Sequence, residues 1–264
     1  MQNSFQHDAW SAGQSYEHYM GRWSRKIARE FVNWLHEAEN LDWLDIGCGT
    51  GALSAAILAQ CAPRSLLGID PSDGFIEHAR RNNVKERVRF EVAGAEALPC
   101  PDRSVDVVTS ALAYNFIPDR SKALSEMQRV AKPGGNVSFY VWDYPGGSIG
   151  FIDTFWNAAV ALDSTAESLV EGTRFPFCTR DVLCSEVTAA GLHDVVAEPI
   201  EIQTRFTDFE TFWHPFTRGA GPAPGYCMSL DKEARQELRQ RLVGKLGPGP
   251  IDLPARAWAV KSVA

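Results

Sequence analysis

The spacing of apolar residues changes along the chain from a helical period to short, strand-like runs. Within residues 15–36, Ile27, Phe31 and Leu35 recur at helical spacing, and Gly21 favours a break between two helices. Beyond this N-terminal helical preface, apolar runs alternate with helical segments. We expect strands at 41–47, 65–70, 87–94 and 105–112, and helices from about 52 and over 73–82. Such alternation predicts a parallel sheet with helices on both faces.

The alternation of expected strands and helices continues to about residue 143 and becomes less regular after about residue 147. A helix over 121–130 should end at "KPGG", where Pro133 cannot continue it, and a buried strand should follow over 136–143. A mixed helical segment to about residue 170 precedes a helix that starts at the cap Thr179 and ends at Gly191. The remaining expected elements are strands at 193–206 and 257–263, a surface excursion at 219–225 and a charged helix at 231–246.

These elements predict one domain of the α/β class. We expect a Rossmann-like, mainly parallel seven-stranded sheet with helices on both faces, an N-terminal helical preface and a partial helical lid. The expected division is a preface at 1–37, a cofactor-binding core at 38–144, and lid segments with the last strands at 145–264. No internal repeat interrupts this plan.

Composition narrows the function classes. The chain has 264 residues and a formal net charge of −7, which argues against nucleic acid as a partner. It has no long apolar run, and "MQNSFQHDAW" lacks the start of a signal peptide, so we expect a cytoplasmic protein without a membrane span. The sequence leaves the oligomeric state open.

The six cysteines show neither a CxxC pair nor the spacing of a zinc site. We therefore expect no metal site, and reduced cysteines that act as small apolar residues.

The stretch "LDIGCGTGAL" carries the strongest chemical signal. Glycines at 47, 49 and 51 allow a sharp turn and a close backbone approach to a ligand, and the next helix offers unpaired N–H groups. The stretch also fits the loose dinucleotide pattern, with Asp70 near the position of a ribose-binding acid. By itself the turn therefore leaves a nicotinamide cofactor open.

Asp45 helps to separate these possibilities. It lies two residues before the first glycine, where a carboxylate is a poor neighbour for a pyrophosphate. The acid suits a cationic ligand, such as a nucleoside with an ammonium group and a sulfonium centre. Asp70 would then accept two hydrogen bonds from the ribose diol.

Four motifs together resemble a known family. "LDIGCGTG", "GIDPS", "AEALPCPDRSVDVV" and "LSEMQRVAKPGG" are similar to successive motifs of class I S-adenosylmethionine-dependent methyltransferases, especially the group with ubiquinone and menaquinone C-methyltransferases. The N-terminal "YEHYMGRWSR" also resembles a preface common in bacterial members of this group. The motif resemblance covers about residues 41–142. After about residue 147 it concerns only the general architecture.

The resemblance implies positions for the cofactor S-adenosyl-L-methionine. The glycine turn would pack against it, Asp45 would lie near its amino-acid portion, and Asp70 would hold its ribose. Family members usually carry an acid for the adenine amino group where this chain has Gly94, so Ala95 or Glu96 would serve instead, or packing would hold the adenine. The expected contacts so far are Asp45, Gly47, Cys48, Gly49, Gly51, Asp70, Pro71, Ser72, Gly94, Ala95 and Glu96.

Two further regions complete this expected site. Residues after the fourth strand would face the methyl group, with Tyr114 as a possible interior support. Tyr19 could stabilise the sulfonium by cation–π attraction. Arg22 could bind the cofactor carboxylate or an acidic substrate, or form a solvated surface pair. The added candidates are Tyr19, Arg22, Ala111, Leu112, Asn115 and Phe116.

Methyl transfer is an in-line displacement, so positioning and exclusion of water supply much of the catalysis and a base is optional. Asp143, His214 and His18 are the candidates for a base, although His214 within "FWHPF" also suits an aromatic cluster. The aromatic-rich segments 145–178 and 206–250 would form the partial lid and select the acceptor.

The sequence thus predicts methyl transfer to a C or O atom of a small-molecule acceptor. Three alternatives stay open. An arsenite methyltransferase would need metalloid-binding thiols, and Cys100, Cys178 and Cys184 show no recognisable arrangement for that role. A nicotinamide oxidoreductase depends on the glycine pattern alone. A non-catalytic sensor or scaffold of the same fold would bind the cofactor without turnover.

Overall fold

The computed structural model describes residues 17–83, 86–218 and 221–264. The chain divides into two compact units. We call the first the sheet unit, which comprises residues 23–142, 177–200 and 257–264. The second, the aromatic unit, comprises the described residues within 17–22, 143–176 and 201–256.

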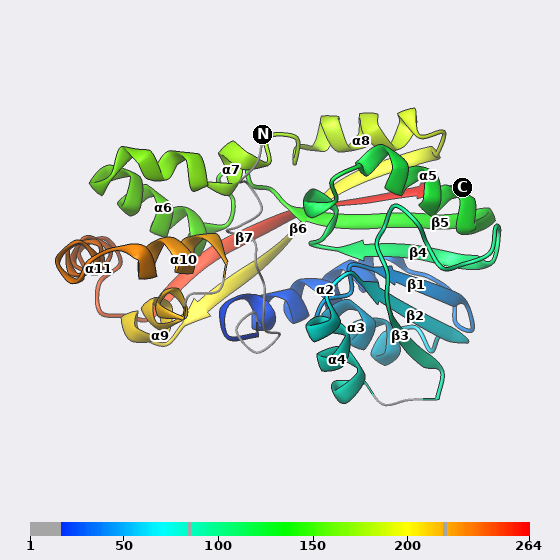
Figure 1. Cartoon of the computed structure of the whole chain (residues 1–264), viewed down its shortest axis with the longest axis horizontal. Coiled ribbons are helices and arrows are strands. Elements are labelled where there is room, and N and C mark those ends of the chain that lie inside the picture. Colours follow the sequence, from blue (N-terminus) through cyan, green and yellow to red (C-terminus); the bar gives the residue numbers. More distant parts are fainter. Residues whose placement is uncertain (1–16, 84–85, 219–220) are drawn as a thin grey trace. The chain divides into compact units, whose positions relative to one another are not determined.

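Parallel pairing dominates the sheet unit (Figure 1). Within the described residues the sheet has seven strands in the order β3-β2-β1-β4-β5-β7-β6. β5 and β7 pair antiparallel, while β1 to β5 pair in parallel. The Rossmann-like, mainly parallel sheet expected from the sequence is therefore confirmed. The strands are β1 (Asp42–Ile46), β2 (Ser65–Asp70), β3 (Val88–Val92), β4 (Val105–Ala111), β5 (Ala131–Trp142), β6 (His193–Phe206) and β7 (Ile251–Val263).

Helices cover both faces of this sheet. Phe139 and Tyr140 are neighbours in β5, so their side chains point to opposite faces. Tyr140 contacts Phe31 of α2 at a ring-centroid distance of 4.6 Å, whereas Phe139 stacks on Tyr114 at 4.2 Å. The N-terminal helix α2 is thus present, as expected. The helical elements of this unit are α2 (Arg22–Leu35, with Arg22 at the unit boundary), α3 (Ala52–Gln60), α4 (Asp73–Asn82), η3 (Tyr114–Phe116), α5 (Arg120–Val130) and α8 (Arg180–Ala189).

The "KPGG" segment forms an excursion inside β5. Against β4, Ala131 pairs with Val105, and the next pair is Asn136 with Val107. The intervening residues leave the ladder, and Gly134 has the left-handed φ of 77° that such a turn favours. Helix α5 ends directly before it, so the predicted end of the helix is confirmed.

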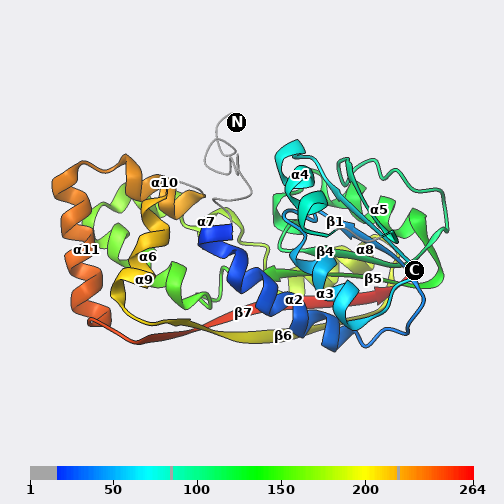
Figure 2. The ribbon, with the colours of Figure 1, turned by 90° about the horizontal axis from the view of Figure 1, so that it is seen from below.

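The aromatic unit has a core of ring side chains. Phe155 stacks on Phe216 at 4.4 Å, and Tyr19 meets Phe216 edge-on at 5.7 Å. The ends of β6 and β7 also belong here, where Thr204 Oγ1 donates to the carbonyl of Leu253 at 2.7 Å; Figure 2 shows the two strands side by side. The helical elements are η2 (Glu17–Gly21), α6 (Gly150–Leu162), η4 (Ser164–Leu169), α7 (Glu171–Arg174), α9 (Phe209–Trp213), η5 (His214–Thr217), α10 (Pro222–Ser229) and α11 (Lys232–Leu246).

One expected loop is a helix. The sequence predicted a surface excursion over 219–225, but α10 begins at Pro222, and Pro222, Ala223 and Pro224 are buried. A proline at the first helical position lacks only an N–H that would have no intrahelical partner, which explains how this segment can start a helix. Residues 219–220 lie outside the described part of the chain.

Candidate functional site

The carboxyl ends of four parallel strands meet at one edge of the sheet unit. Cys48 N, just after β1, donates to the carbonyl of Ile69 in β2 at 2.9 Å, and Ala93 N, just after β3, donates to the carbonyl of Asp70 at 3.2 Å. The loop after β4 lies against Gly47, as described below. In open parallel sheets this edge is where ligands bind. It collects most of the residues singled out in the sequence.

The glycine turn after β1 has left-handed backbone at all three glycines, with φ of 66° at Gly47, 53° at Gly49 and 90° at Gly51. A Cβ at Gly47 would lie 2.4 Å from Ala113 Cβ, so the turn packs directly on the loop after β4. A Cβ at Gly49 would meet nothing within 4 Å. The backbone at Gly49 therefore faces open space that a ligand can approach closely.

Asp70 is held rigidly at the end of β2. Its Oδ2 accepts from Gly49 N at 3.0 Å, and its Oδ1 accepts from Ser72 N at 2.9 Å. Burial raises the pKa of this carboxyl, and the two backbone bonds oppose that rise. Each carboxylate oxygen has room for a second hydrogen bond. Asp70 can thus accept a pair of hydroxyl groups beside the glycine turn.

Asp45 is fully buried, next to the same turn. Its Oδ2 accepts from Ser54 Oγ of α3 at 2.6 Å, while its Oδ1 has no hydrogen-bond partner among the described residues. Burial raises the pKa of Asp45 to about 7, and the bond from Ser54 limits the rise. A buried carboxyl with one oxygen that no described residue bonds, and with no ion pair among the described residues, suits a cationic ligand group.

The loop after β4 is strained and carries an unusual buried amide. Leu112 has a left-handed φ of 55°, which is rare for a bulky residue. Asn115 is 5% exposed, and both polar atoms of its amide lack a hydrogen-bond partner within the described chain. Tyr114 is interior, as expected, with its hydroxyl donating to Glu186 at 2.7 Å.

The remaining candidates of this edge differ in what their side chains can do. The Cys48 side chain packs with Ile76, Ala79 and Phe90, so only its backbone can face a ligand. Ser72 caps α4 by accepting from Phe75 N, and Pro71 is exposed. Ala111 ends β4, and Phe116 ends the short helix η3.

The loop after β3 contains the residues expected to replace the missing acid. Gly94 directly follows Ala93, which is bonded to Asp70, and a Cβ at Gly94 would lie 3.4 Å from Glu96 Oε2. Ala95 is buried, whereas Glu96 is partly exposed and its Oε1 accepts from Asp119 N at 3.4 Å. The Glu96 carboxylate thus folds back over Gly94.

Five candidates belong to the aromatic unit. The Asp143 carboxylate, in a side chain 4% exposed, accepts from Arg256 Nε at 2.8 Å and from Gly146 N at 3.1 Å. His214 is exposed and bonded to Arg218 at 2.9 Å, not packed within the aromatic cluster. Tyr19 is buried among rings, and the His18 side chain lies outside the described residues.

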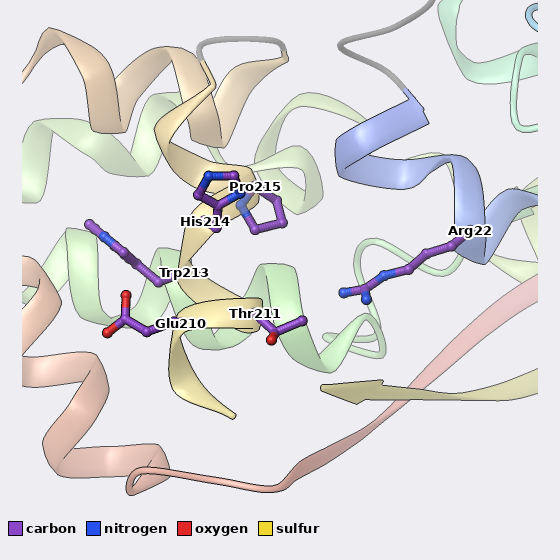
Figure 3. Close-up of a pocket in the computed structure, with 6 residues that line it drawn as sticks. All are labelled: Arg22, Glu210, Thr211, Trp213, His214 and Pro215. Atoms are coloured by element: carbon purple, nitrogen blue, oxygen red, sulfur yellow. The ribbon is translucent and has the colours of Figure 1, made fainter. Parts of the chain in front are cut away.

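Arg22 lines a cavity of about 420 Å³ in the aromatic unit. Its guanidinium lies 4.6 Å from the ring centre of Phe206. Figure 3 shows its side chain extending towards Thr211 and Pro215. The other lining residues are Glu210, Thr211, Trp213, His214 and Pro215.

Comparison with known proteins relates the strand-end edge of the sheet unit to a protein family. Residues 44–139 match the family described as "Methyltransferase domain". This segment contains the glycine turn, Asp70 and the loop after β4. Residues 44–139 are a class I methyltransferase domain.

Similar proteins carry related names. The chain is 38% identical to a demethylmenaquinone methyltransferase of Symbiobacterium thermophilum over 44% of this chain and 47% of that protein. It is 30% identical to a malonyl-[acyl-carrier protein] O-methyltransferase of Methylococcus capsulatus over 56% and 50%. The chain thus spans about half the length of these curated relatives. A putative methyltransferase from an antibiotic biosynthesis pathway of Anabaena variabilis has the same fold, with a TM-score of 0.63, 20% identity and coverage of 90% and 97%.

Two features of the methyltransferase domain were not predicted from the sequence. Ser54 lies on the buried face of α3 and bonds to Asp45 nine residues earlier. A serine on the buried face of an apolar helix was the available signal, because a buried hydroxyl needs a partner. The left-handed Leu112 has no sequence signal, since leucine rarely takes that conformation.

No metal centre is evident in the described residues, which contain no group of three or more His, Cys, Asp or Glu side chains placed to hold an ion. Four of the six cysteines are buried, namely Cys48, Cys61, Cys178 and Cys227. The helices within the described ranges are all too short or too polar to cross a bilayer.

Proposed function

We propose that this chain transfers a methyl group from S-adenosylmethionine to a C or O atom of a small-molecule acceptor. The observation that carries the proposal is the pairing of the open glycine turn with Asp70, whose carboxylate is anchored by Gly49 N and Ser72 N. This arrangement lies inside the matched methyltransferase domain. The similar demethylmenaquinone methyltransferase and malonyl-[acyl-carrier protein] O-methyltransferase support methyl transfer, in the second case to an oxygen atom.

The residues present fit the cofactor. The space at Gly49 admits the ligand against the turn, and the remaining acceptor positions of Asp70 suit a ribose diol. The unused oxygen of Asp45 suits an ammonium group, and the buried amide of Asn115 can both donate to a carboxylate and accept from an amine. When bound, the cofactor supplies an electrophilic methyl group on a sulfonium.

The chain's own contribution is positioning. An in-line displacement needs the acceptor atom, methyl carbon and sulfur held in a line, and a fixed site supplies this without a proton transfer. Asp143 is already occupied by Arg256, and His214 by Arg218. We therefore infer that Asp143 and His214 each hold a neighbouring arginine in place within the aromatic unit. Neither group has to act as a base if the acceptor atom is acidic enough to lose its proton to water before the transfer.

Calorimetric titration with S-adenosylhomocysteine, and separately with NAD, tests the proposal. We expect micromolar binding of S-adenosylhomocysteine, weakened about 10- to 100-fold in Asp70→Ala because hydrogen bonds to a charged group are lost. Asp73→Ala is the matched control, since Asp73 is an exposed carboxylate three residues away. It should bind as tightly as the natural chain.

Other results would favour the alternatives. Binding of NAD without S-adenosylhomocysteine would reject the proposal in favour of an oxidoreductase. Cofactor binding without turnover of any component of a broad metabolite extract would favour a sensor or scaffold. Arsenite binding with a stoichiometric loss of free thiols would favour an arsenite methyltransferase.

A further inference from the structure

The loop after β4 is bonded to a residue that lies far from it in the sequence. Tyr114 of this loop is fully buried, its ring stacks on Phe139 at 4.2 Å, and its hydroxyl donates to Glu186 Oε2 at 2.7 Å. Glu186 belongs to α8, 72 positions further along the chain. Burial raises the pKa of Tyr114, and the bond to Glu186 adds to the rise, so the hydroxyl keeps the proton that it donates.

Glu186 is fixed in turn by Arg120, the first residue of α5. Arg120 Nη2 donates to Glu186 Oε1 at 2.7 Å, and Arg120 Nε donates to Glu186 Oε2 at 3.2 Å. The guanidinium therefore binds both oxygens of the carboxylate. It also lies 3.6 Å from the ring centre of Phe177, which covers one of its flat faces. The carboxylate that accepts from Tyr114 thus has little freedom to move.

The backbone of the loop needs such support. Leu112 has a left-handed φ of 55°, and strained backbone of this kind persists only where the surrounding structure holds it in place. Ala113, between Leu112 and Tyr114, packs directly on the glycine turn at Gly47. A displacement of Tyr114 would therefore change the contact between the loop and the glycine turn.

Asn115 is the residue whose amide this arrangement controls. It follows Tyr114 in the short helix η3, where three residues make a turn and neighbouring side chains point in different directions. Its amide is buried, and neither polar atom has a hydrogen-bond partner within the described chain. A buried amide of this kind loses free energy unless a ligand bonds to it. Anchoring Tyr114 therefore sets the position of a side chain that is still available for a ligand.

We propose that Glu186 is a positioning residue of the cofactor site, which holds the loop after β4 through the Tyr114 hydroxyl and so fixes the Asn115 amide for the ligand. Glu186 acts through Tyr114 and makes no contact with the ligand itself. The inference rests on the proposed binding of S-adenosylmethionine. It adds a residue outside the matched segment 44–139, and all its contacts lie within the sheet unit.

Calorimetric titration of the full chain with S-adenosylhomocysteine tests the inference. Tyr114→Phe keeps the ring and removes only the hydroxyl, and Glu186→Ala removes the acceptor of that hydroxyl. Each should weaken binding at least threefold, because the apparent affinity falls with the fraction of molecules whose loop is correctly placed. The double variant should bind about as tightly as either single variant, since both changes remove the same bond.

Two further variants separate positioning from a general loss of stability. Glu186→Gln keeps an oxygen that can accept from Tyr114, so it should bind S-adenosylhomocysteine more tightly than Glu186→Ala. The matched control is Lys132→Ala, which breaks an ion pair of similar exposure with Asp106. Asp106 lies at the start of β4, at the opposite end of the strand from the loop. Lys132→Ala should therefore leave binding unchanged.

Amide hydrogen exchange reports on the loop itself. Leu112 N donates to the carbonyl of Tyr140, and Phe116 N donates to the carbonyl of Ala113, both at 2.9 Å. These two amides should exchange at least threefold faster in Tyr114→Phe, because the loop opens more often when its anchor is lost. They should exchange at the natural rate in Lys132→Ala.

The possible failures are distinguishable. A natural chain that does not bind S-adenosylhomocysteine would reject the proposed function, and this inference with it. A natural chain that binds, with equally tight binding by Tyr114→Phe and Glu186→Ala, would reject the inference alone. Weaker binding by Lys132→Ala, to the same extent as by Glu186→Ala, would also reject it. Should Glu186→Ala fail to fold, Tyr114→Phe carries the test.

Discussion

The buried aspartates of the strand-end edge differ from Asp143 of the aromatic unit in their hydrogen-bond partners. In the sheet unit, Asp45 and Asp70 accept hydrogen bonds from neutral donors, a hydroxyl and two backbone N–H groups. In the aromatic unit, the most buried aspartate, Asp143, is paired with Arg256. A carboxylate without a counter-charge can still bind a cation or a diol. The charge of a paired carboxylate is already compensated by its partner. The difference separates Asp45 and Asp70, which we propose bind a ligand, from Asp143, which is paired within its own unit.

The backbone shows the same contrast. Left-handed glycines occur in both units, but within the described chain the left-handed residues other than glycine, such as Leu112 at the strand-end edge, all lie in the sheet unit, and strained backbone of this kind concentrates at functional sites. The aromatic unit is held by ring contacts and side-chain pairs. We therefore expect backbone changes to matter most in the first unit and charge changes in the second.

The largest expected effect is that of Gly47→Ala. An alanine here needs a left-handed φ and puts its Cβ 2.4 Å from Ala113 Cβ, where neither backbone can yield easily. The expected loss of unfolding free energy is about 2–5 kcal/mol. Urea denaturation measures it, and S-adenosylhomocysteine binding should be lost as well.

Gly134→Ala is the control for backbone strain alone. Gly134 has a similar φ of 77°, but its Cβ would meet nothing within 4 Å. Its expected cost is only about 1–2 kcal/mol, with unchanged ligand binding. Equal losses for the two variants would mean that the close packing of Gly47 on the loop after β4 contributes nothing.

Arg256→Ala should have the next largest effect, in the aromatic unit. It leaves the carboxylate of Asp143, whose side chain is 4% exposed, without its cation. Unfolding free energy should fall by about 2–4 kcal/mol, less than for a fully enclosed pair because Arg256 is partly exposed.

The variant Asp143→Asn distinguishes a structural role of Asp143 from a role as the catalytic base. Lower stability together with full methyl transfer per folded molecule supports the first, and unchanged stability with lost turnover supports the second.

The buried carboxyl of Glu171 should make the free energy of unfolding depend on pH. Burial raises its pKa from 4.5 to about 7, Asp153 adds to the rise, and bonds from Trp156 Nε1 and charge from Arg174 oppose it. The unfolded chain therefore binds fewer protons between about pH 4.5 and 7. The contribution of Glu171 is fully present below about pH 4.5, and as pH rises through 7 the chain loses on the order of 3 kcal/mol.

Glu171→Gln should remove this part of the slope, because the amide keeps an oxygen for Trp156 and does not titrate. Urea denaturation at pH 5 and pH 7.5 compares the variant with the natural chain. The control is Glu167→Gln, an exposed carboxylate four residues earlier whose removal should leave the slope as it was. A slope that survives in Glu171→Gln would assign the pH dependence to other groups.

The two units also differ in how far the sequence could predict them. In the sheet unit, β2, α4 and the start of α3 occupy the predicted residues, because glycine turns, helix caps and short apolar runs are local signals. In the aromatic unit, 222–225 was misjudged, since buried prolines in a helix depend on neighbours from distant segments. The ion pair of Asp143 joins residues 113 positions apart, so no local sequence pattern could predict it.

The candidate site shows the same division. Asp45, Asp70 and the glycines could be predicted as cofactor contacts because their chemistry is tied to a short motif, and these roles stay predictions. The unpartnered amide of Asn115 and the bond from Ser54 required the packed structure, because satisfaction of a buried polar group depends on the whole environment. The roles of Tyr19, Arg22 and His18, and the division into preface, core and lid, stay predictions.

Gly49→Ala is expected to have the smallest effect on stability and a clear effect on binding. Its φ of 53° costs an alanine about 1–2 kcal/mol, and its Cβ would lie in open space. That space is where we place the cofactor, so the added methyl group should weaken S-adenosylhomocysteine binding at least tenfold. Gly134→Ala again supplies the comparison, with the same kind of strain and no loss of affinity. If Gly49→Ala binds the ligand normally, the cofactor does not approach the turn at this residue, and the uncompensated carboxylates of Asp45 and Asp70 would need another explanation.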